Sequence, residues 1–213
     1  MDERRIRDFL AGLADIPDDT PKRLNEFEVY GLLDAVGFDR CPAIFLPAEA
    51  DEDERERWAA EAAGLADEEG RLLLKVVGRE ILHKTEAGGV RVLRGAGKDT
   101  LVGAVAGIKA TVAEAGHGPS VEGFLAAAFV PHAPNTPGQE VLLSVRQDPA
   151  FGPCVVVGIG GTLTEWFGKV GDSTLILPAA NLSEKTVTDA LAAHPALRIL
   201  ATPSRLYPEP PLS

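Results

Sequence analysis

The feature that most constrains this chain is an apolar run followed by a cationic, glycine-containing turn. Residues 72–77 read Leu-Leu-Leu-Lys-Val-Val, which predicts a buried strand with one lysine, Lys75, near its end. Residues 90–93 predict a returning strand, and the turn before them contains a histidine, a second lysine and the pair Gly88–Gly89. Cations and paired glycines between strands indicate a polyphosphate site, because glycine lets the backbone approach phosphate oxygens without a side-chain clash.

Charge is unevenly distributed along the chain. The formal net charge is −11, yet residues 71–98 contain seven basic residues against two acids, a local excess of five. Such an excess inside an acidic protein predicts a small, locally bound anionic ligand. An edge strand decorated with solvated lysines and arginines is the alternative that the pattern leaves open.

Composition excludes several classes of partner. The 213 residues are enough for one large domain or two small ones, and the apolar content of 45% supports a real core. The acidic balance argues against nucleic acid or an anionic membrane as the main partner. No apolar run approaches the roughly 20 residues of a membrane span. Cys41 and Cys154 lack metal-ligand spacing, so we expect reduced, buried thiols in a cytoplasmic protein.

Helix and strand signals are mixed along the chain. Asn25 and Glu28 form a capping-box pattern, Gly37 is a stop signal, and Asp99 is a predicted N-cap. The pattern indicates an α/β or α+β fold. The expected helices cover residues 6–13, 25–36, 51–66, 99–114 and 183–193, and the expected strands cover 43–46, 72–77, 90–93, 123–130, 140–147, 154–159 and 174–177.

Lys75 and His83 are the candidates for chemistry in the first half. A lysine in an apolar strand is rarely buried without a partner, so its ammonium is predicted to meet a phosphate; the alternative is a strand-end lysine that reaches water. An imidazole can attack phosphorus and hold a phosphoryl group, with Lys84 screening the added charge; the alternative is a turn histidine that bonds a carbonyl.

A second glycine pair, Gly160–Gly161, follows the apolar run 154–159 and is weak evidence for a phosphate loop by itself. Glu140 and Glu165 are candidate ligands of a metal or a ribose, because nucleotide-bound hard cations take carboxylate oxygens. Exposed acids without a role are the alternative. The remaining histidines have no spacing that suggests zinc.

Two blocks of the sequence resemble a known family, the ATP-grasp domain of ADP-forming acyl-CoA synthetases, which includes ADP-forming acetate–CoA ligase and is related to the succinyl-CoA synthetase β-subunit. The first block is Lys-Val-Val at 75–77 with Ile-Leu-His-Lys-Thr-Glu-Ala-Gly-Gly-Val at 81–90. The second is Asp-Pro-Ala-Phe-Gly-Pro at 148–153 with Gly-Ile-Gly-Gly-Thr-Leu-Thr-Glu at 158–165. The helix that opens the domain is similar from Leu24, and the likeness continues to Leu177.

The resemblance implies an α+β, ATP-grasp-like fold of two α/β subdomains with a nucleotide cleft between them, divided at residues 1–122 and 123–200 before an irregular, proline-rich tail at 201–213. It implies ATP/ADP and Mg²⁺ as cofactors, His83 as the phosphate relay, and a CoA-binding subunit or domain as a partner. Nucleotide-binding roles are assigned to Lys75, Lys84, Glu86, Gly88, Gly89, Gly160 and Gly161, and metal roles to Glu140 and Glu165.

The chain departs from the family pattern at several places. The polar adenine hinge of the family is Ala126–Phe129 here, and the arginine before the Phe-Gly-Pro turn is Gln147. The family's magnesium-binding Asp-x-Asn-Pro block and CoA-binding domain do not occur in this sequence. We therefore expect a truncated, partly degenerate member: a nucleotide-binding domain or subunit of an acetate–CoA-like ligase or, alternatively, a catalytically silent relative acting as a regulatory or interaction module.

Overall fold

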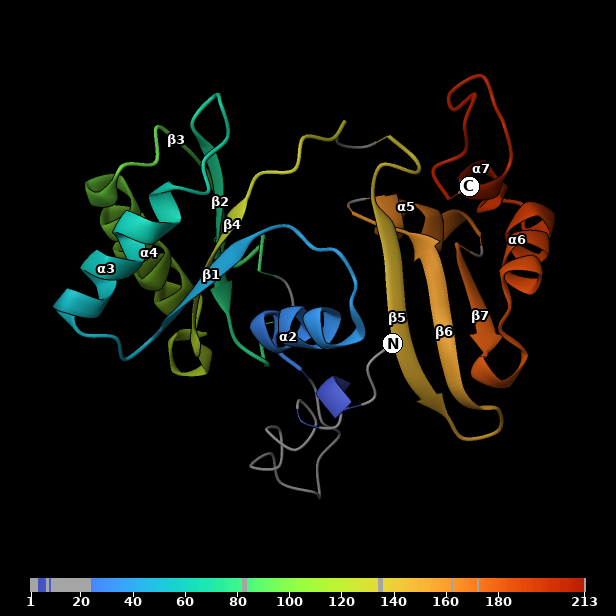
Figure 1. Cartoon of the computed structure of the whole chain (residues 1–213), viewed down its shortest axis with the longest axis horizontal. Helices are drawn as coiled ribbons and strands as arrows, with labels where there is room; N and C mark the ends of the chain where they lie inside the picture. Colours follow the sequence, from blue (N-terminus) through green and yellow to red (C-terminus); the bar gives the residue numbers. More distant parts are fainter. Residues whose placement is uncertain are drawn as a thin grey trace. The chain divides into compact units, whose positions relative to one another are not determined.

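The computed structural model describes residues 4–6, 8, 24–81, 84–133, 136–161, 163–171 and 173–212, without the side chains of Glu165 and Val170. The chain forms two compact units, Met1–Val130 and Pro131–Ser213 (Figure 1). Each unit combines helices with an antiparallel sheet, which confirms the predicted α+β class. The helix expected over residues 6–13 falls mostly outside the described residues.

The first unit is built on a four-stranded sheet. Its strands are β1 (Ala43–Pro47), β2 (Arg71–Val77), β3 (Val90–Arg94) and β4 (Gly123–Ala128), in the order β1-β4-β2-β3. Every neighbouring pair is antiparallel, and β2 is an inner strand between β4 and β3. The strands predicted at 43–46, 72–77 and 90–93 are confirmed.

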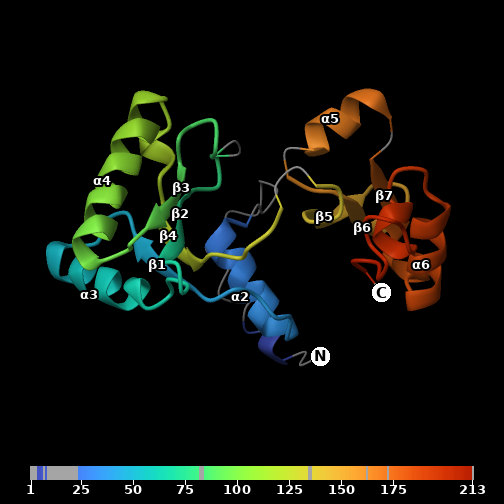
Figure 2. The ribbon, with the colours of Figure 1, turned by 90° about the horizontal axis from the view of Figure 1, so that it is seen from above.

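The two faces of this sheet are covered by different helices. Helices α3 (Glu52–Ala63) and α4 (Lys98–Glu114) lie on one face, and α2 (Glu26–Val36) lies on the other (Figure 2). Successive side chains of a strand point to opposite faces. The side chains of β2 that join the core with α3 and α4 are Leu72, Leu74 and Val76. Lys75 therefore faces the side of α2.

Helix α2 begins where the sequence predicts. Asn25 Oδ1 accepts a hydrogen bond from Glu28 N–H at 2.9 Å, and Asn25 N–H donates to Glu28 Oε2 at 2.8 Å. This reciprocal pair satisfies backbone donors that a helix start leaves unpaired. Gly37, with a φ of 74°, ends the helix in the left-handed conformation that favours glycine.

The N-cap predicted for α4 is wrong. Gly97 is the N-cap, with φ −75° and ψ 165° and no side-chain hydrogen bond, and the helix begins at Lys98. Asp99 is already in the first turn, where its negative charge still favours the helix N-terminus.

The second unit contains a three-stranded antiparallel sheet in the order β5-β6-β7. Its core packs Val157 and Ile159 of β6 against Leu191, Leu197 and Leu200. The elements of this unit are β5 (Val141–Asp148), β6 (Gly152–Ile159), α5 (Leu163–Val170), β7 (Thr174–Pro178), η2 (Ala179–Asn181), α6 (Glu184–Ala193) and α7 (Arg198–Ala201); the 3₁₀ helix η1 (Gly118–Ser120) belongs to the first unit.

The structure divides the chain later than the predicted boundary after residue 122. Strand β4 was expected to open the second part, but it pairs with β1 and β2. These pairings place it in the first sheet. The tail has no helix or strand after Ala201 among the described residues, yet it is held: Tyr207 Oη donates to Pro137 O at 2.8 Å, and Leu212 N–H donates to Leu200 O at 2.9 Å.

Both cysteines are free thiols. Cys154 is buried, whereas Cys41 is half-buried with its Sγ 3.5 Å from Tyr30 Oη. Within the described part of the chain, no helix combines the length and the apolar character that a membrane crossing needs.

Candidate functional site

Two lysines from different segments meet at one carboxylate. Lys75 Nζ lies 2.6 Å from Glu26 Oε1, and Lys84 Nζ lies 2.6 Å from Glu26 Oε2. The exposed fractions of the Lys75, Lys84 and Glu26 side chains are 22%, 20% and 20%. Charge-assisted hydrogen bonds of this kind are stronger than neutral ones. The predicted pair of cations is therefore assembled, and an acidic side chain of α2 occupies the anion position between them.

Strand alternation and a closed turn bring the two lysines together. Lys75 pairs with Val90 across β2 and β3, on the face of α2. The turn is closed by two backbone hydrogen bonds of 2.7 Å, from Gly89 N–H to Lys84 O and from Val76 N–H to Gly89 O. These bonds hold the backbone of Lys84 beside the end of β2, so its ammonium reaches the same carboxylate as Lys75.

Two opposing influences act on the pKa of Glu26, namely burial and the two neighbouring lysines. Burial is the largest single influence and acts to raise the pKa. The positive charges of Lys75 and Lys84, together with their hydrogen bonds, outweigh burial and hold the pKa below its ordinary value. Glu26 is therefore ionised at neutral pH and neutralises one of the two cations.

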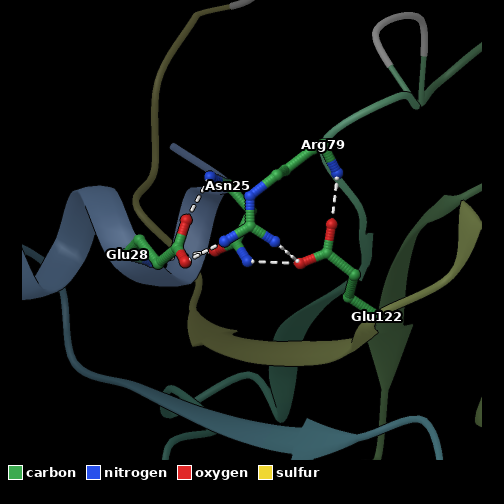
Figure 3. Close-up of polar contacts among 4 residues, drawn as sticks. All are labelled: Asn25, Glu28, Arg79 and Glu122. Carbon is green, nitrogen blue, oxygen red and sulfur yellow. Dashed lines mark hydrogen bonds and ion pairs between the residues drawn. The ribbon is translucent and has the colours of Figure 1, made fainter. Parts of the chain in front are cut away.

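Arg79 forms a second attachment of α2 to the same turn, which Figure 3 shows. Its guanidinium pairs with both Glu28 and Glu122, and its backbone N–H donates to Glu122 Oε1 at 2.7 Å. Asn25 Nδ2 donates to Glu122 Oε2 at 2.8 Å. The capping residues of α2 are thus linked to the turn and to the residue before β4.

The second network also lowers the pKa of one of its carboxyl groups, that of Glu122. Burial acts to raise the pKa of Glu122, but hydrogen bonds from Arg79 and Asn25 and the charge of Arg79 lower it overall. The network has one unsatisfied group among the described residues, Arg79 Nε, which is buried without a partner. An unpaired buried donor costs free energy, so this atom offsets part of the stability that the ion pairs of the network contribute.

The pair Gly88–Gly89 is required by the turn itself. Gly88 has a φ of 68° and its N–H donates to Thr85 O at 3.1 Å. A Cβ added at Gly89 would overlap the side chain of Val76. Both N–H groups are engaged within the protein, so the nucleotide-binding role of the pair stays a prediction.

In the second unit, Glu140 lies with the pair Gly160–Gly161. Gly160 N–H donates to Glu140 O at 2.8 Å, and a Cβ added at Gly161, whose φ is 64°, would overlap the Glu140 carboxylate. Three of the predicted site residues of this unit are therefore adjacent, directly before α5. Glu165 is in α5, and its side chain lies outside the description.

The remaining predicted residues are not tested by these contacts. His83 lies outside the described residues, so its relay role stays a prediction. Glu86 is exposed, and among the described ion pairs none joins it to either lysine of the site. In the searched part of the chain, no three acidic, histidine or cysteine side chains converge as a metal cage would require. The alanines at the hinge position belong to β4, and Ala126 and Ala127 are buried there.

Sequence reasoning missed Glu26, Arg79 and Glu122 as site residues. Glu26 lies 49 positions from Lys75, and Glu122 lies 43 positions from Arg79, so no local sequence spacing predicts either contact. The available signal was the local excess of positive charge, which needs acids from elsewhere in the chain when it is partly buried.

The fold and the cationic turn define the class of this protein. Residues 16–208 match the family described as the ATP-grasp domain. Because this match covers most of the chain, the protein belongs to the ATP-grasp domain family. The predicted family resemblance is confirmed, and with it the ATP-grasp character of the α+β fold.

Two curated relatives with similar sequences are both ADP-forming acetate–CoA ligases. The chain is 31% identical over 106 residues to an ADP-forming acetate–CoA ligase I of Archaeoglobus fulgidus, and 30% identical over 97 residues to an ADP-forming acetate–CoA ligase of Methanocaldococcus jannaschii. These matches cover 49% and 45% of this chain. They span only 14% and 13% of the two relatives.

Solved structures share the fold over almost the whole chain. A dinucleotide-forming acetyl-coenzyme A synthetase 1 of Ca. Korarchaeum cryptofilum, in complex with coenzyme A and Ca-AMPCP, has a TM-score of 0.67 at 25% identity, covering 95% of this chain and 78% of that chain. A Pyrococcus horikoshii protein has a TM-score of 0.67 at 21% identity, covering 94% and 76%. A further Korarchaeum structure, with coenzyme A and Mg-AMPPCP, has a TM-score of 0.60 at 22% identity, covering 93% and 75%.

Proposed function

We propose that this chain is the nucleotide-binding ATP-grasp domain or subunit of an ADP-forming acyl-CoA ligase of the acetate–CoA type, with Lys75 and Lys84 holding nucleotide phosphate. The observation that carries the proposal is the convergence of these two lysines on one carboxylate. A geometry that accommodates the Glu26 carboxylate between two ammonium groups also suits a phosphate oxygen pair. The relatives named acetate–CoA ligase support the reaction class.

In this proposal the lysines act by charge and position. An ammonium group has three donors and no acceptor, so each lysine can hold a phosphate oxygen as a point charge. Phosphoryl transfer gains most from cations that neutralise charge developing on the phosphate oxygens. A partner domain or subunit that binds coenzyme A then supplies the acyl half of the reaction.

His83 is the proposed phosphate relay. In the direction of ATP use, one imidazole nitrogen attacks the γ-phosphorus, a P–N bond forms, and the bond to the bridging oxygen breaks. ADP leaves with the electron pair of that bond. In the direction of ATP formation, a terminal ADP oxygen attacks the phosphohistidine and the imidazole leaves. Support for this step comes from the position of His83 in the family block, next to Lys84.

For the second unit by itself, Gly160, Gly161 and Glu140 are proposed to bind nucleotide phosphate and its metal ion. Mg²⁺ arrives bound to nucleotide phosphates and needs only one or two protein carboxylates, which fits a site with Glu140 and, as a second candidate, Glu165. When bound, the ion would neutralise phosphate charge. Glu140 would hold it by one carboxylate, and the glycine pair leaves the space beside that carboxylate free of a Cβ.

Calorimetric titration with Mg-ATP and Mg-ADP tests nucleotide binding. We expect Lys75→Ala and Lys84→Ala each to weaken binding at least about tenfold, equivalent to about 1.4 kcal/mol. Lys98→Ala is the matched control, because Lys98 pairs with Glu56 at an exposed position of the same unit. Equal affinities for all three variants and the parent chain would contradict the proposal.

Radiolabelled ATP tests the relay separately. Incubation with ATP labelled in the γ-phosphate and Mg²⁺ should leave acid-labile label on the parent chain and none on a His83→Asn variant. Label that persists in the variant would place the phosphate elsewhere. Because the assay needs no acyl substrate, it can be run without a coenzyme A-binding partner.

A catalytically silent relative is the second candidate function. Two observations favour it: Glu26 already accepts a hydrogen bond from each of the two lysines, and the hinge alanines Ala126 and Ala127 are buried without polar side chains. A folded parent chain that neither binds Mg-ATP nor accepts label would support this candidate over the first. Phosphate on His83 would exclude it.

A further inference from the structure

We propose that Glu26 is an internal anion that competes with the ligand for Lys75 and Lys84, so that an anion binds the two lysines only by displacing it. The inference rests on the proposed function, because it concerns the same two lysines. It assigns to α2 a role in controlling ligand affinity in addition to its place in the fold.

The Glu26 carboxylate contacts the two lysines in the way that we expect of an anionic ligand. Each of its carboxylate oxygens accepts from a different lysine at 2.6 Å. Lys75 belongs to an inner strand of the sheet and Lys84 to the turn after it, whereas Glu26 belongs to a separate helix. The carboxylate can therefore move away while β2 holds Lys75 and the turn after β2 holds Lys84.

Helix α2 is attached mainly by polar contacts. Its buried residues comprise Ala35 alone, whereas α3 buries three residues and α4 buries five. Its other attachments include the Arg79 network, the contact of Tyr30 with Cys41, and a stacked pair of rings, Phe27 and Phe45, with centroids 4.4 Å apart. Elements with few buried apolar contacts open locally at lower free energy than the core. Displacement of Glu26 is therefore compatible with an intact sheet.

The charges of the competing groups predict which anions displace Glu26 most readily. Glu26 brings one negative charge to two positive ones, so a monovalent anion that replaces it restores only the charge that was lost. A triphosphate brings several negative charges and more acceptor oxygens, and each lysine has donors that Glu26 leaves unused. The parent chain should therefore prefer polyanions strongly, and removal of the Glu26 charge should strengthen the binding of both kinds of anion.

The opposite role makes opposite predictions. If Glu26 is a permanent orienting group, the ligand joins it instead of replacing it. Loss of its charge would then weaken binding of every anion, and ligand binding would protect α2. The direction of each effect therefore separates a competitor from a positioning carboxylate.

The experiment compares the full chain with a Glu26→Gln variant, using sodium tripolyphosphate and sodium formate as probes in calorimetric titrations. We expect Glu26→Gln to bind both probes at least about tenfold more tightly, because the competing state lowers both affinities by the same factor. The control is Glu56→Gln, which removes one negative charge from the exposed pair with Lys98 and should leave both affinities unchanged. Unchanged or weaker binding of tripolyphosphate by Glu26→Gln would overturn the inference.

Hydrogen exchange in the parent chain gives a second readout that needs no variant. Tripolyphosphate should accelerate amide exchange in the peptide that contains α2, while formate should not, and peptides from α4 should be unaffected by either. Slower exchange of α2 with tripolyphosphate would overturn the inference.

The outcomes also separate this inference from the proposed function. Binding of Mg-ATP by the parent chain with no effect of Glu26→Gln overturns the inference alone. Tighter binding of tripolyphosphate by Glu26→Gln, in a chain that does not bind Mg-ATP, supports the inference and contradicts the nucleotide function. Absence of binding to every probe in both chains overturns both.

Discussion

The two units each place one carboxylate against a glycine-containing turn, but with opposite electrostatics. In the first unit, Glu26 lies between two lysines that hold its pKa below the ordinary value. In the second, Glu140 packs over Gly161, and among the described ion pairs none involves this carboxylate. The first unit therefore holds a carboxylate that is paired with two lysines, whereas the second holds a carboxylate without a described ion pair.

The largest expected effect concerns the glycine turn of the first unit. Gly89→Ala should destabilise this unit by roughly 3 kcal/mol, because the new Cβ overlaps Val76 in the core strand. Urea unfolding followed by tryptophan fluorescence measures it. Gly103→Ala is the control: that glycine is in α4 with open space around it, so alanine should stabilise by about 0.5–1 kcal/mol. Equal effects of the two substitutions would contradict this account of the turn.

The corresponding change in the second unit is Gly160→Ala. A Cβ there would lie 2.8 Å from Glu140 C and 2.9 Å from Val141 N, both backbone atoms that cannot rotate away. We expect a loss of about 2 kcal/mol confined to the second unit. Hydrogen exchange resolved by peptide would show faster opening of β5 and β6 with α3 and α4 unchanged, and a uniform change across both units would break the comparison.

Removal of the Arg79 side chain should have an effect of similar or slightly smaller size. Arg79→Ala leaves the carboxylates of Glu28 and Glu122 without their cation, which should cost about 1–2 kcal/mol because the network is only partly buried. Arg79→Lys keeps the charge and should recover part of this loss. The midpoint of thermal unfolding measures both variants, and an Arg79→Ala chain as stable as the parent would show that this network contributes little.

The smallest effect is the pH dependence that Glu26 contributes. Its pKa is lowered by folding, so its ion pairs stabilise the folded state above the ordinary pKa of 4.5 and lose that contribution as the pH falls through the folded value. The parent chain should be more stable than Glu26→Gln at neutral pH, and the difference should shrink below pH 4.5. Urea titrations across acidic pH measure the difference, and a constant gap would contradict the ion pairing.

The local signals of this sequence predicted local structure well. The capping box at Asn25 and Glu28 and the apolar run at 72–77 give an element and its boundaries because their partners lie within a few residues. Helix α5 was missed: it follows a glycine pair and contains Gly168, and both features favour a turn when the sequence is considered alone. Strand β4 was recognised as a strand but placed in the second part of the chain, because its pairing with β1 and β2 depends on contacts that are distant in sequence.

The sequence predicted the cationic and glycine residues of the site but not the acidic residues that pair with its cations. The lysines and the glycine pairs are identified by their positions within two short blocks, and Glu140 was a candidate because of its carboxylate. The partners that determine the charge of the site, Glu26 for Lys75 and Glu122 for Arg79, come from remote parts of the chain. Acids in a helix ordinarily indicate an exposed face or a favourable first turn, so their long-range role emerges only in the folded protein.

The central claim is that Lys75 and Lys84 together form the anion site of an ATP-grasp domain. The most direct test is the affinity for Mg-ATP, measured by calorimetry, of the parent chain, the double variant Lys75→Ala/Lys84→Ala and the exposed-lysine variant Lys98→Ala. The account predicts binding by the parent chain and by Lys98→Ala, and no detectable binding by the folded double variant. A folded double variant that binds Mg-ATP as tightly as the parent chain would contradict it.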